Sequence, residues 1–263
     1  MRMDDAPRLH FHRYEFKYLI SGSTLSGILR ELELRLDRDI HSDTTGSYFV
    51  RSHYFDTDSF DLFYEKLAGL RKRYKFRLRS YSSTARYSNP LFLELKGRTD
   101  SLVYKHRLLL DPGAIEKSMR NGTIHFAELL LDTHESSRTG SRFVFDAFRK
   151  RISPSVVVDY HRTAFENRAN PDFRVTLDRE ILAYRAGSNG HPAGNCHLIS
   201  DGSTVLEIKF RYHLPAWFHR LIQEFELKRI SFSKFAYATD VVYMNTYYSN
   251  LDRVLERRPA CLN

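Results

Sequence analysis

The chain has 263 residues, a formal net charge of +9 and two cysteines, Cys196 and Cys261. Two cysteines are too few for a disulfide framework, and no apolar run approaches the roughly 20 residues that a membrane-spanning helix needs. With an N-terminus that lacks an apolar signal core, these features predict a soluble, cytoplasmic, single domain over residues 1–263 that has an anionic partner.

Short segments that alternate apolar and charged residues predict strands, because alternate residues of a strand share one face. Apolar residues three or four positions apart predict helices. In the first part of the chain, the sequence predicts a strand at 11–20, a helix from Ser23 to about Arg38, a strand at 48–56 and a helix or turn at 56–66. It then predicts strands at 73–82, 91–98 and 102–110, followed by helical structure at 113–151. The last part is predicted to have strands at 155–166, 172–178 and 204–212 with a loop at 186–190, a helix from Pro215, and a helix from Ser231 or Ser233 to about Val254. The spacing of about ten residues between the central strands favours an antiparallel meander.

In these strands, the face opposite the apolar one carries Arg and Lys with a few isolated acids. The cations assigned to it are Arg13, Lys17, Lys75, Arg77, Arg79, Lys96, Arg98, Lys105, Arg107, Arg162, Arg174, Lys209 and Arg211. Tyr160 shares this face, and its acids are Glu15, Glu94, Asp178 and Glu207. For any single strand, a solvated face with cross-strand ion pairs is the ordinary interpretation, and that interpretation stays open. Over six strands, however, the cations outnumber the acids about three to one, and their repulsion predicts an anionic ligand.

The chemistry of this face favours phosphate. Arg forks match phosphate oxygens in a bidentate way, and Lys supplies a point charge. Isolated carboxylates among cations suit a hard divalent cation that bridges to phosphate, so the pattern predicts a metal–polyphosphate site inside a barrel. Nucleic acid is disfavoured because the aromatic residues alternate onto the opposite face, where they are not placed to stack on bases. The sequence contains no P-loop, no dinucleotide-binding glycine motif, no Gly-x-Ser-x-Gly and no zinc-ligand spacing.

An ordered set of motifs resembles the VTC domain, the polyphosphate polymerase branch of the triphosphate tunnel metalloenzymes, over about residues 11 to 245. The motifs are RYEFKY at 13–18, YFD at 54–56, FRLR at 76–79, LELK at 93–96, YHRTAF at 160–165, LEIK at 206–209 and SFSKF at 231–235. The resemblance implies an α+β fold, a closed antiparallel β-barrel tunnel of about eight strands with flanking helices. It also implies ATP as phosphoryl donor, inorganic polyphosphate as acceptor, and Mn²⁺ or Mg²⁺.

The resemblance, combined with the strand pattern, assigns roles to individual residues. The expected catalytic cations are Lys17, Arg77, Arg79, Arg162 and Lys209. The expected substrate-binding residues are Arg13, Lys75, Lys96, Arg98, Lys105, Arg107, Tyr160, Arg174, Ser233 and Lys234. The expected metal ligands are Glu207, Glu94 and Glu15.

Two departures from the family pattern stand out. The hydrolytic branch carries Glu-x-Glu-x-Lys on its first strand, whereas this chain has Arg13 at the first Glu, which fits the polymerase branch better. Arg98 stands where polymerases carry a His.

The sequence therefore predicts an ATP–polyphosphate phosphotransferase. The alternatives are a metal-dependent triphosphatase, in which water attacks instead, and a non-catalytic sensor of polyphosphate or inositol phosphates. The regulatory and membrane domains of the fungal proteins are missing from this sequence, which leaves room for a separate membrane-protein partner. The oligomeric state is left open.

Overall fold

The computed structural model of the protein describes residues 14–84, 87, 90–100, 102–117, 119–120, 123–124, 138–200 and 202–244. Its centre is an antiparallel sheet of ten strands in the order β1-β12-β10-β9-β3-β4-β5-β6, with β2 added to β9 and β11 added to β10. The strands are β1 (Tyr14–Ile20), β2 (Asp37–Arg38), β3 (Tyr48–Asp56), β4 (Lys72–Ser80), β5 (Leu91–Thr99), β6 (Leu102–Leu110), β9 (Ser153–Glu166), β10 (Arg174–Ala186), β11 (Pro192–Leu198) and β12 (Thr204–Phe210). A separate hairpin consists of β7 (Met119–Arg120) and β8 (Thr123–Ile124).

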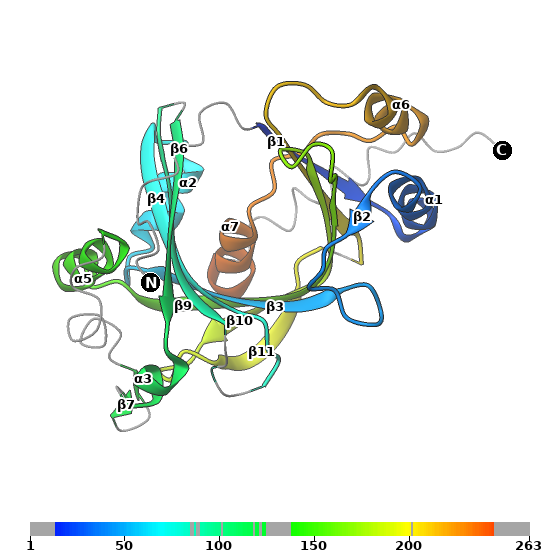
Figure 1. Cartoon of the computed structure of the whole chain (residues 1–263). Coiled ribbons are helices and arrows are strands. Elements are labelled where there is room, and N and C mark those ends of the chain that lie inside the picture. The colour runs from blue at the N-terminus through cyan, green and yellow to red at the C-terminus, as the bar shows by residue number, and fades with distance from the viewer. Residues whose placement is uncertain are drawn as a thin grey trace.

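The sheet curves into a U whose open side lies between β1 and β6 (Figure 1). These two strands end the hydrogen-bonded order and do not pair with each other, so the predicted closed barrel is wrong. The free edge of β1 is instead used by the segment before α7. Tyr18 bridges Arg229, and the Ile230 amide donates to the Lys17 carbonyl at 2.8 Å. This segment takes a place beside β1 that β6 would need in order to close the barrel.

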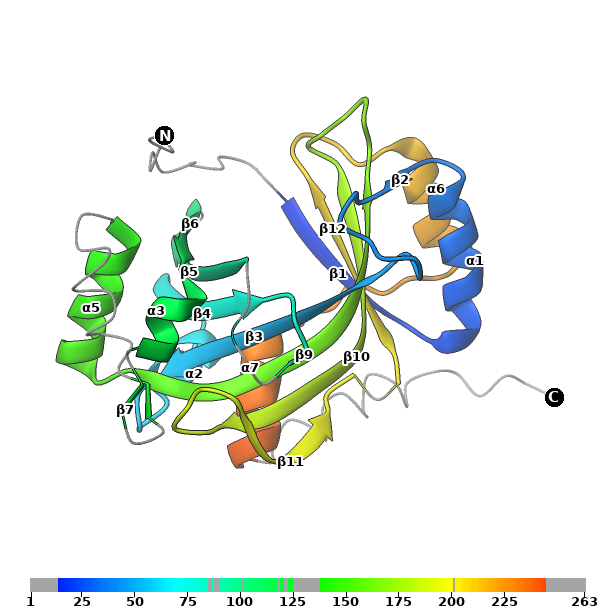
Figure 2. The same ribbon diagram turned by 60° about the horizontal axis from the view of Figure 1, so that its bottom comes forward.

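Helices lie on both sides of the sheet. They are α1 (Gly22–Glu33), α2 (Asp61–Leu67), α3 (Pro112–Lys117), α5 (Arg138–Lys150), α6 (Ala216–Glu224) and α7 (Lys234–Thr239), the last continuing into the π-helical turn η1 (Asp240–Met244). Helices α1 and α6 lie side by side on the convex side of β1, β12 and β10, whereas α7 lies inside the U (Figures 1 and 2). None of the helices among the residues described is long and apolar enough to cross a membrane.

Packing on the convex side fixes which side chains face inward. On β12, Leu206 and Ile208 are fully buried in a core shared with α1 and α6. Burying such a side chain stabilises the fold by about 1.5–3 kcal/mol. A slip of one residue would exchange them for Glu207 and Lys209, so the hydrophobic core holds these two side chains on the concave side.

The same alternation operates on β4 through a second core. The Phe76 ring meets Phe143 of α5 edge to face, with centroids 5.0 Å apart, and Leu78 is fully buried beside it. Residues 75, 77 and 79 therefore face the inside of the U, where α7 lies.

The predicted strands at 48–56 and 102–110 are confirmed, and those at 73–82, 91–98 and 155–166 differ only at their ends. Strand β10 is longer than predicted, because it continues through 179–186 with a bulge and pairs with β11, which was not predicted. Helix α1 ends at Glu33 instead of Arg38. Within the predicted helical stretch at 113–151, the described residues form α3, β7, β8 and α5. The last helical stretch is described only to Met244, so its predicted extension to Val254 lies outside the described residues.

Candidate functional site

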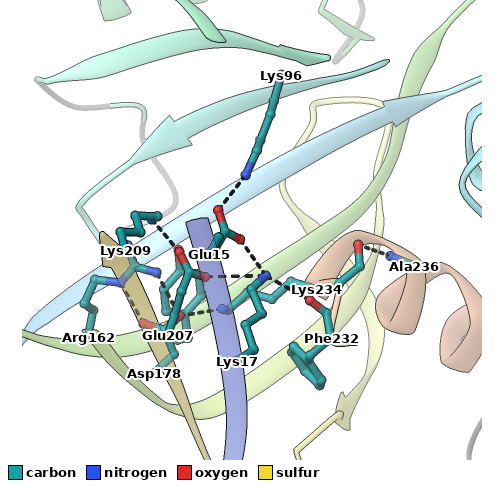
Figure 3. Close-up of polar contacts among 12 residues, drawn as sticks. Glu15, Lys17, Lys96, Arg162, Asp178, Glu207, Lys209, Phe232, Lys234 and Ala236 are labelled. Carbon is teal, nitrogen blue, oxygen red and sulfur yellow. Dashed lines mark hydrogen bonds and ion pairs between the residues drawn. The ribbon is translucent and has the colours of Figure 1, made fainter. Parts of the chain in front are cut away.

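Two carboxylates enclose the Lys17 ammonium on β1 and β12. Lys17 lies opposite Glu207 in the strand register, and Glu15 lies opposite Lys209. Lys17 Nζ is 3.1 Å from Glu15 Oε1 and 3.4 Å from Glu207 Oε2, and it donates a hydrogen bond of 2.9 Å to the Phe232 carbonyl (Figure 3). Lys209 pairs with the other oxygen of Glu207. The backbone register thus creates an alternating acid–lysine cluster.

Electrostatics keep this cluster ionised. Burial and the nearby Glu207 would raise the pKa of Glu15, but Lys96, Lys17 and Lys209 lower it to about 2. Burial would likewise raise the pKa of Glu207, yet Lys209 and Lys17 hold it well below its ordinary value. Both side chains are therefore anionic acceptors at neutral pH.

A second group joins β9, β10 and the start of α7. Asp178 is fully buried and accepts two hydrogen bonds from Arg162, at 2.6 and 2.8 Å, and a further one from Lys234. Burial would raise the pKa of Asp178, but Arg162 and Lys234 lower it to about 2. Ser233 caps α7 by accepting from the Ala236 amide at 3.4 Å, which places Lys234 in the first turn inside the U. The structure thus brings the SFSKF motif to the β9–β10 wall, as Figure 3 shows.

A third group lies on β4, β5 and β6. Its centre is Glu94, which is 1% exposed and pairs with Arg77, with Lys105 at 2.6 Å and with Arg107 at 2.7 Å. Burial would raise the pKa of Glu94, but Arg77, Arg79, Lys105 and Arg107 hold it well below its ordinary value. Burial lowers the pKa of Lys105 to about 7, with Arg77 and Arg107 adding to the effect and Glu94 opposing it.

Two further cations have no carboxylate within ion-pair distance in the described part of the chain. Arg79 is 6% exposed; its Nη2 donates to the Tyr160 hydroxyl at 3.0 Å, and its Nε has no partner. Lys75 Nζ lies over the rings of Tyr54 and Phe235, 5.4 and 5.6 Å from their centroids. Burial and repulsion from Lys96, Arg77 and Lys17 hold the pKa of Lys75 well below its ordinary value. A buried donor without an acceptor costs about 1–3 kcal/mol, so the Arg79 Nε calls for an anionic acceptor.

These residues together form what we call the charged face, on the concave side of the sheet. It consists of Glu15, Lys17, Lys75, Arg77, Arg79, Glu94, Lys96, Lys105, Arg107, Tyr160, Arg162, Asp178, Glu207, Lys209 and Lys234.

The remaining predicted site residues lie beyond the residues of the charged face. Arg98 is exposed at one end of β5 and donates to the Asp100 carbonyl at 2.6 Å. Arg174 lies at the end of β10 and pairs with Asp39 and Glu166. Arg211 follows β12 and is half-exposed. Arg13 lies outside the described residues.

Two cations near the charged face, Arg73 on β4 and Lys66 on α2, were not among the predicted site residues. Arg73 precedes Lys75 by two positions, so the alternation that identified Lys75 would have found it. Lys66 is on α2, where strand periodicity gives no signal.

The acid–lysine cluster fits a divalent cation. Thr176 lies opposite Glu207 in the register, and its hydroxyl is buried without a partner. Two carboxylates and a hydroxyl are the hard oxygen ligands that Mg²⁺ and Mn²⁺ prefer. Among the described residues no three His, Cys, Asp or Glu side chains lie close enough together to hold a metal by themselves. A cation held by Glu207 and Glu15 would therefore need further oxygens, such as those of a phosphate.

Comparison with proteins of known structure identifies the fold. Two putative adenylate cyclases of known structure share the fold. The one from Bacillus halodurans has a TM-score of 0.51 at 13% identity over 85% of this chain and 96% of its own. The one from Hippeastrum, reported to have a dominant triphosphatase activity, has a TM-score of 0.54 at 16% identity over 89% and 98%. At these identities the likeness shows the fold alone. No curated protein sequence gives a significant match.

The family model for the VTC domain matches residues 12–243, which include the charged face and the SFSKF motif. The match confirms the resemblance predicted from the ordered motifs, and the chain belongs to the VTC domain family.

Proposed function

We propose that the protein transfers the terminal phosphoryl group of ATP to a growing chain of inorganic polyphosphate held on the charged face. The observation that carries the proposal is the unbalanced positive charge of this face. Each of its four carboxylates is shared by at least two cations, and Arg79 and Lys75 have no carboxylate partner among the residues that the structure describes. A linear polyanion would supply the missing charge along the whole inside of the U. Membership of a triphosphate-tunnel family supports an enzyme that acts on phosphates.

The proposed reaction needs positioning and charge stabilisation. A terminal oxygen of the polyphosphate chain attacks the γ-phosphorus of ATP, the bond from the γ-phosphorus to the β,γ-bridging oxygen breaks, and ADP leaves with that oxygen. No general base is required, because the attacking phosphate oxygen is already anionic. Arg77, Arg79 and Arg162 would hold non-bridging oxygens of the transferred group, while Lys17 on β1 and Lys209 on β12 would neutralise charge.

Tunnel-fold triphosphatases generally use divalent metal ions. Here Glu207 and Glu15 would hold Mn²⁺ or Mg²⁺, which would neutralise charge on the phosphate oxygens. Glu94 was predicted as a third ligand. Because Arg77, Lys105 and Arg107 surround it, we propose that it orients these cations for the substrate.

The test is incubation of the protein with ATP and Mn²⁺, with polymer, ADP and orthophosphate measured separately. We expect phosphate to accumulate in chains, with ADP released in step. The inactive control is Arg162→Gln, which removes the bidentate partner of Asp178 and should abolish formation of both polymer and ADP. ADP with an equal amount of orthophosphate and no chains would identify a triphosphatase. Tight binding of polyphosphate with no ADP would identify a sensor.

A further inference from the structure

The charged face continues beyond the residues assigned to the proposed reaction. In the β4–β5 register Lys75 lies opposite Lys96, and Arg73 lies opposite Arg98 one step further along the same face. Like charges directly opposite each other destabilise a sheet. The Arg73–Arg98 pair therefore weakens the end of this hairpin unless an anion binds there.

Within the part of the chain that the structure describes, both arginines contact backbone carbonyls and no carboxylate. Arg73 donates to the Leu70 carbonyl, and Arg98 Nε donates to the Asp100 carbonyl at 2.6 Å. Within the described ranges neither has a carboxylate at ion-pair distance. Each therefore keeps guanidinium donors available while its orientation is fixed by a backbone contact.

These two side chains line an open pocket of about 380 Å³ together with Gly69, Arg71 and Asp100. Among the described residues, the lining contains three guanidinium groups, one carboxylate and no aromatic ring on which a base could stack. Its composition is that of a site for a chain of phosphates and not for single-stranded nucleic acid.

Lys66 lies next to this pocket, because its carbonyl accepts a hydrogen bond of 3.3 Å from the amide of Gly69, a lining residue. It is half-buried in the last turn of α2, immediately before the segment that forms the pocket. Burial lowers the pKa of Lys66, and the charges of Arg73 and Lys17 lower it further. Lys66 is therefore within electrostatic range of both Arg73 in the pocket and Lys17 in the acid–lysine cluster.

We infer that this pocket, lined by Gly69, Arg71, Arg73, Arg98 and Asp100 and here called the rim pocket, binds the distal part of a polyphosphate chain whose reacting end lies on the charged face. The inference rests on the proposed function and extends it to chain length. Arg73 is four residues from Arg77 on one strand, a distance of about 13 Å. A triphosphate held at Arg77 ends before the rim pocket, whereas a longer chain continues into it.

The test compares two ligands, inorganic tripolyphosphate and long-chain inorganic polyphosphate, on the full chain. In the double variant Arg71→Gln/Arg73→Gln we expect the affinity for long chains to fall at least about tenfold, equal to ~1.4 kcal/mol, and the affinity for tripolyphosphate to stay within about twofold. Retained tripolyphosphate binding also shows that the variant is folded. The matched control is Lys72→Gln/Arg149→Gln, which removes the same charge from exposed positions, Lys72 pointing away from the charged face and Arg149 lying on α5.

The outcomes separate this inference from the proposed function. A selective loss of long-chain binding, absent from the control, supports the rim pocket, as do shorter products at an unchanged initial rate of ADP release. Equal losses in the two double variants would show a general effect of net charge and overturn the inference, as would unchanged long-chain binding. Binding of single-stranded RNA that is tighter than polyphosphate and equally sensitive to the variant would assign the pocket to another ligand. A wild-type protein that binds neither phosphate ligand would overturn the proposed function itself.

Discussion

Glu15 on β1 and Lys96 on β5 form an ion pair, 3.2 Å from oxygen to nitrogen, although their strands share no backbone hydrogen bond. The pair spans the open side of the U and joins its two walls through side chains (Figure 3). Both groups are partly exposed, at 28% and 39%, and such pairs contribute only about 0.2–1 kcal/mol. The two walls are thus weakly connected without a ligand, and a bound polyanion would contact cations on both.

Ligand binding should therefore stabilise the two edges of the sheet. We expect tripolyphosphate to slow amide hydrogen exchange in β1 and β5, because phosphates that contact Lys17 and Lys96 together bridge the opening. Lys96→Met should reduce this protection on β1, where the sequence is unchanged. Protection confined to β4 and β5 in the wild-type protein would contradict a ligand that spans both walls.

Arg77 and Arg79 should respond differently to substitution although they share one strand face. Arg77 pairs with buried Glu94, so Arg77→Gln should lower the free energy of unfolding by about 1–3 kcal/mol. Arg79 has no carboxylate within ion-pair distance among the described residues and has a buried Nε without an acceptor, so Arg79→Gln should leave stability unchanged or raise it. Both variants should bind tripolyphosphate at least about tenfold more weakly, since each loses a charge-assisted hydrogen bond of ~1.5–3 kcal/mol.

Chemical denaturation and titration calorimetry on the two single variants provide the measurement. Each variant serves as the control for the other, since both remove one guanidinium from the same strand. A loss of stability in Arg79→Gln equal to that in Arg77→Gln would mean that Arg79 is as important to the folded structure as the Arg77–Glu94 pair. Undiminished tripolyphosphate binding in both would place the ligand elsewhere.

Much of the charged face could be predicted because strand periodicity is a local property. The alternation around Glu207, Lys209, Arg77 and Glu94 depends only on which residues are apolar, and the cores beneath them follow that pattern. The sharing of acids among cations could not be predicted in the same way. Arg162 and Lys234 both meet Asp178, and this contact depends on where α7 lies inside the U.

Closure of the sheet is the property that sequence reasoning got wrong. Whether β1 pairs with β6 depends on curvature and on competition for one strand edge. The competing segment, around Arg229, carries no strand pattern of its own, and it meets β1 through one bridge and a single backbone hydrogen bond. Strand β11 was missed for a related reason. Its sequence, PAGNCHL, contains Pro and Gly, which are unfavourable in strands, and its pairing with β10 compensates for this.

Glu207 gives a test of the metal assignment. Glu207→Gln keeps the shape of the side chain and removes the charge that a hard cation needs. We expect turnover to fall by about two orders of magnitude or more, because loss of even an outer-shell partner of a metal costs ~10–100-fold. The fold should persist, since Lys17 keeps Glu15 and the Phe232 carbonyl as partners.

Two measurements check this assignment, initial rates across a range of Mn²⁺ concentrations and calorimetric titration of Mn²⁺ in the presence of tripolyphosphate. Thr176→Val is a conservative companion, because it removes only the unpartnered hydroxyl opposite Glu207 and should weaken Mn²⁺ binding less. Full activity of Glu207→Gln at low Mn²⁺ would show that Glu207 is not a metal ligand.

Lys105 should make phosphate binding depend on pH near neutrality. Its pKa is lowered from an ordinary value of 10.5 to about 7, chiefly by burial. As pH rises through 7, Lys105 loses its proton and the charged face loses a positive charge, so the affinity for tripolyphosphate should fall. Between pH 6 and pH 8 the loss should reach about tenfold if the bound anion keeps the amine protonated. Lys105→Arg stays charged throughout this range and should remove the dependence that comes from the protein, which separates it from titration of the ligand.

Without ligand, the free energy of unfolding should change with pH in the opposite direction to the ligand affinity. The unfolded chain keeps the proton that the folded chain releases between pH 7 and about 10, so the free energy of unfolding should rise over that range in the wild-type protein and stay flatter in Lys105→Arg. Parallel pH profiles for the two proteins, in binding and in unfolding, would show that Lys105 keeps its ordinary pKa.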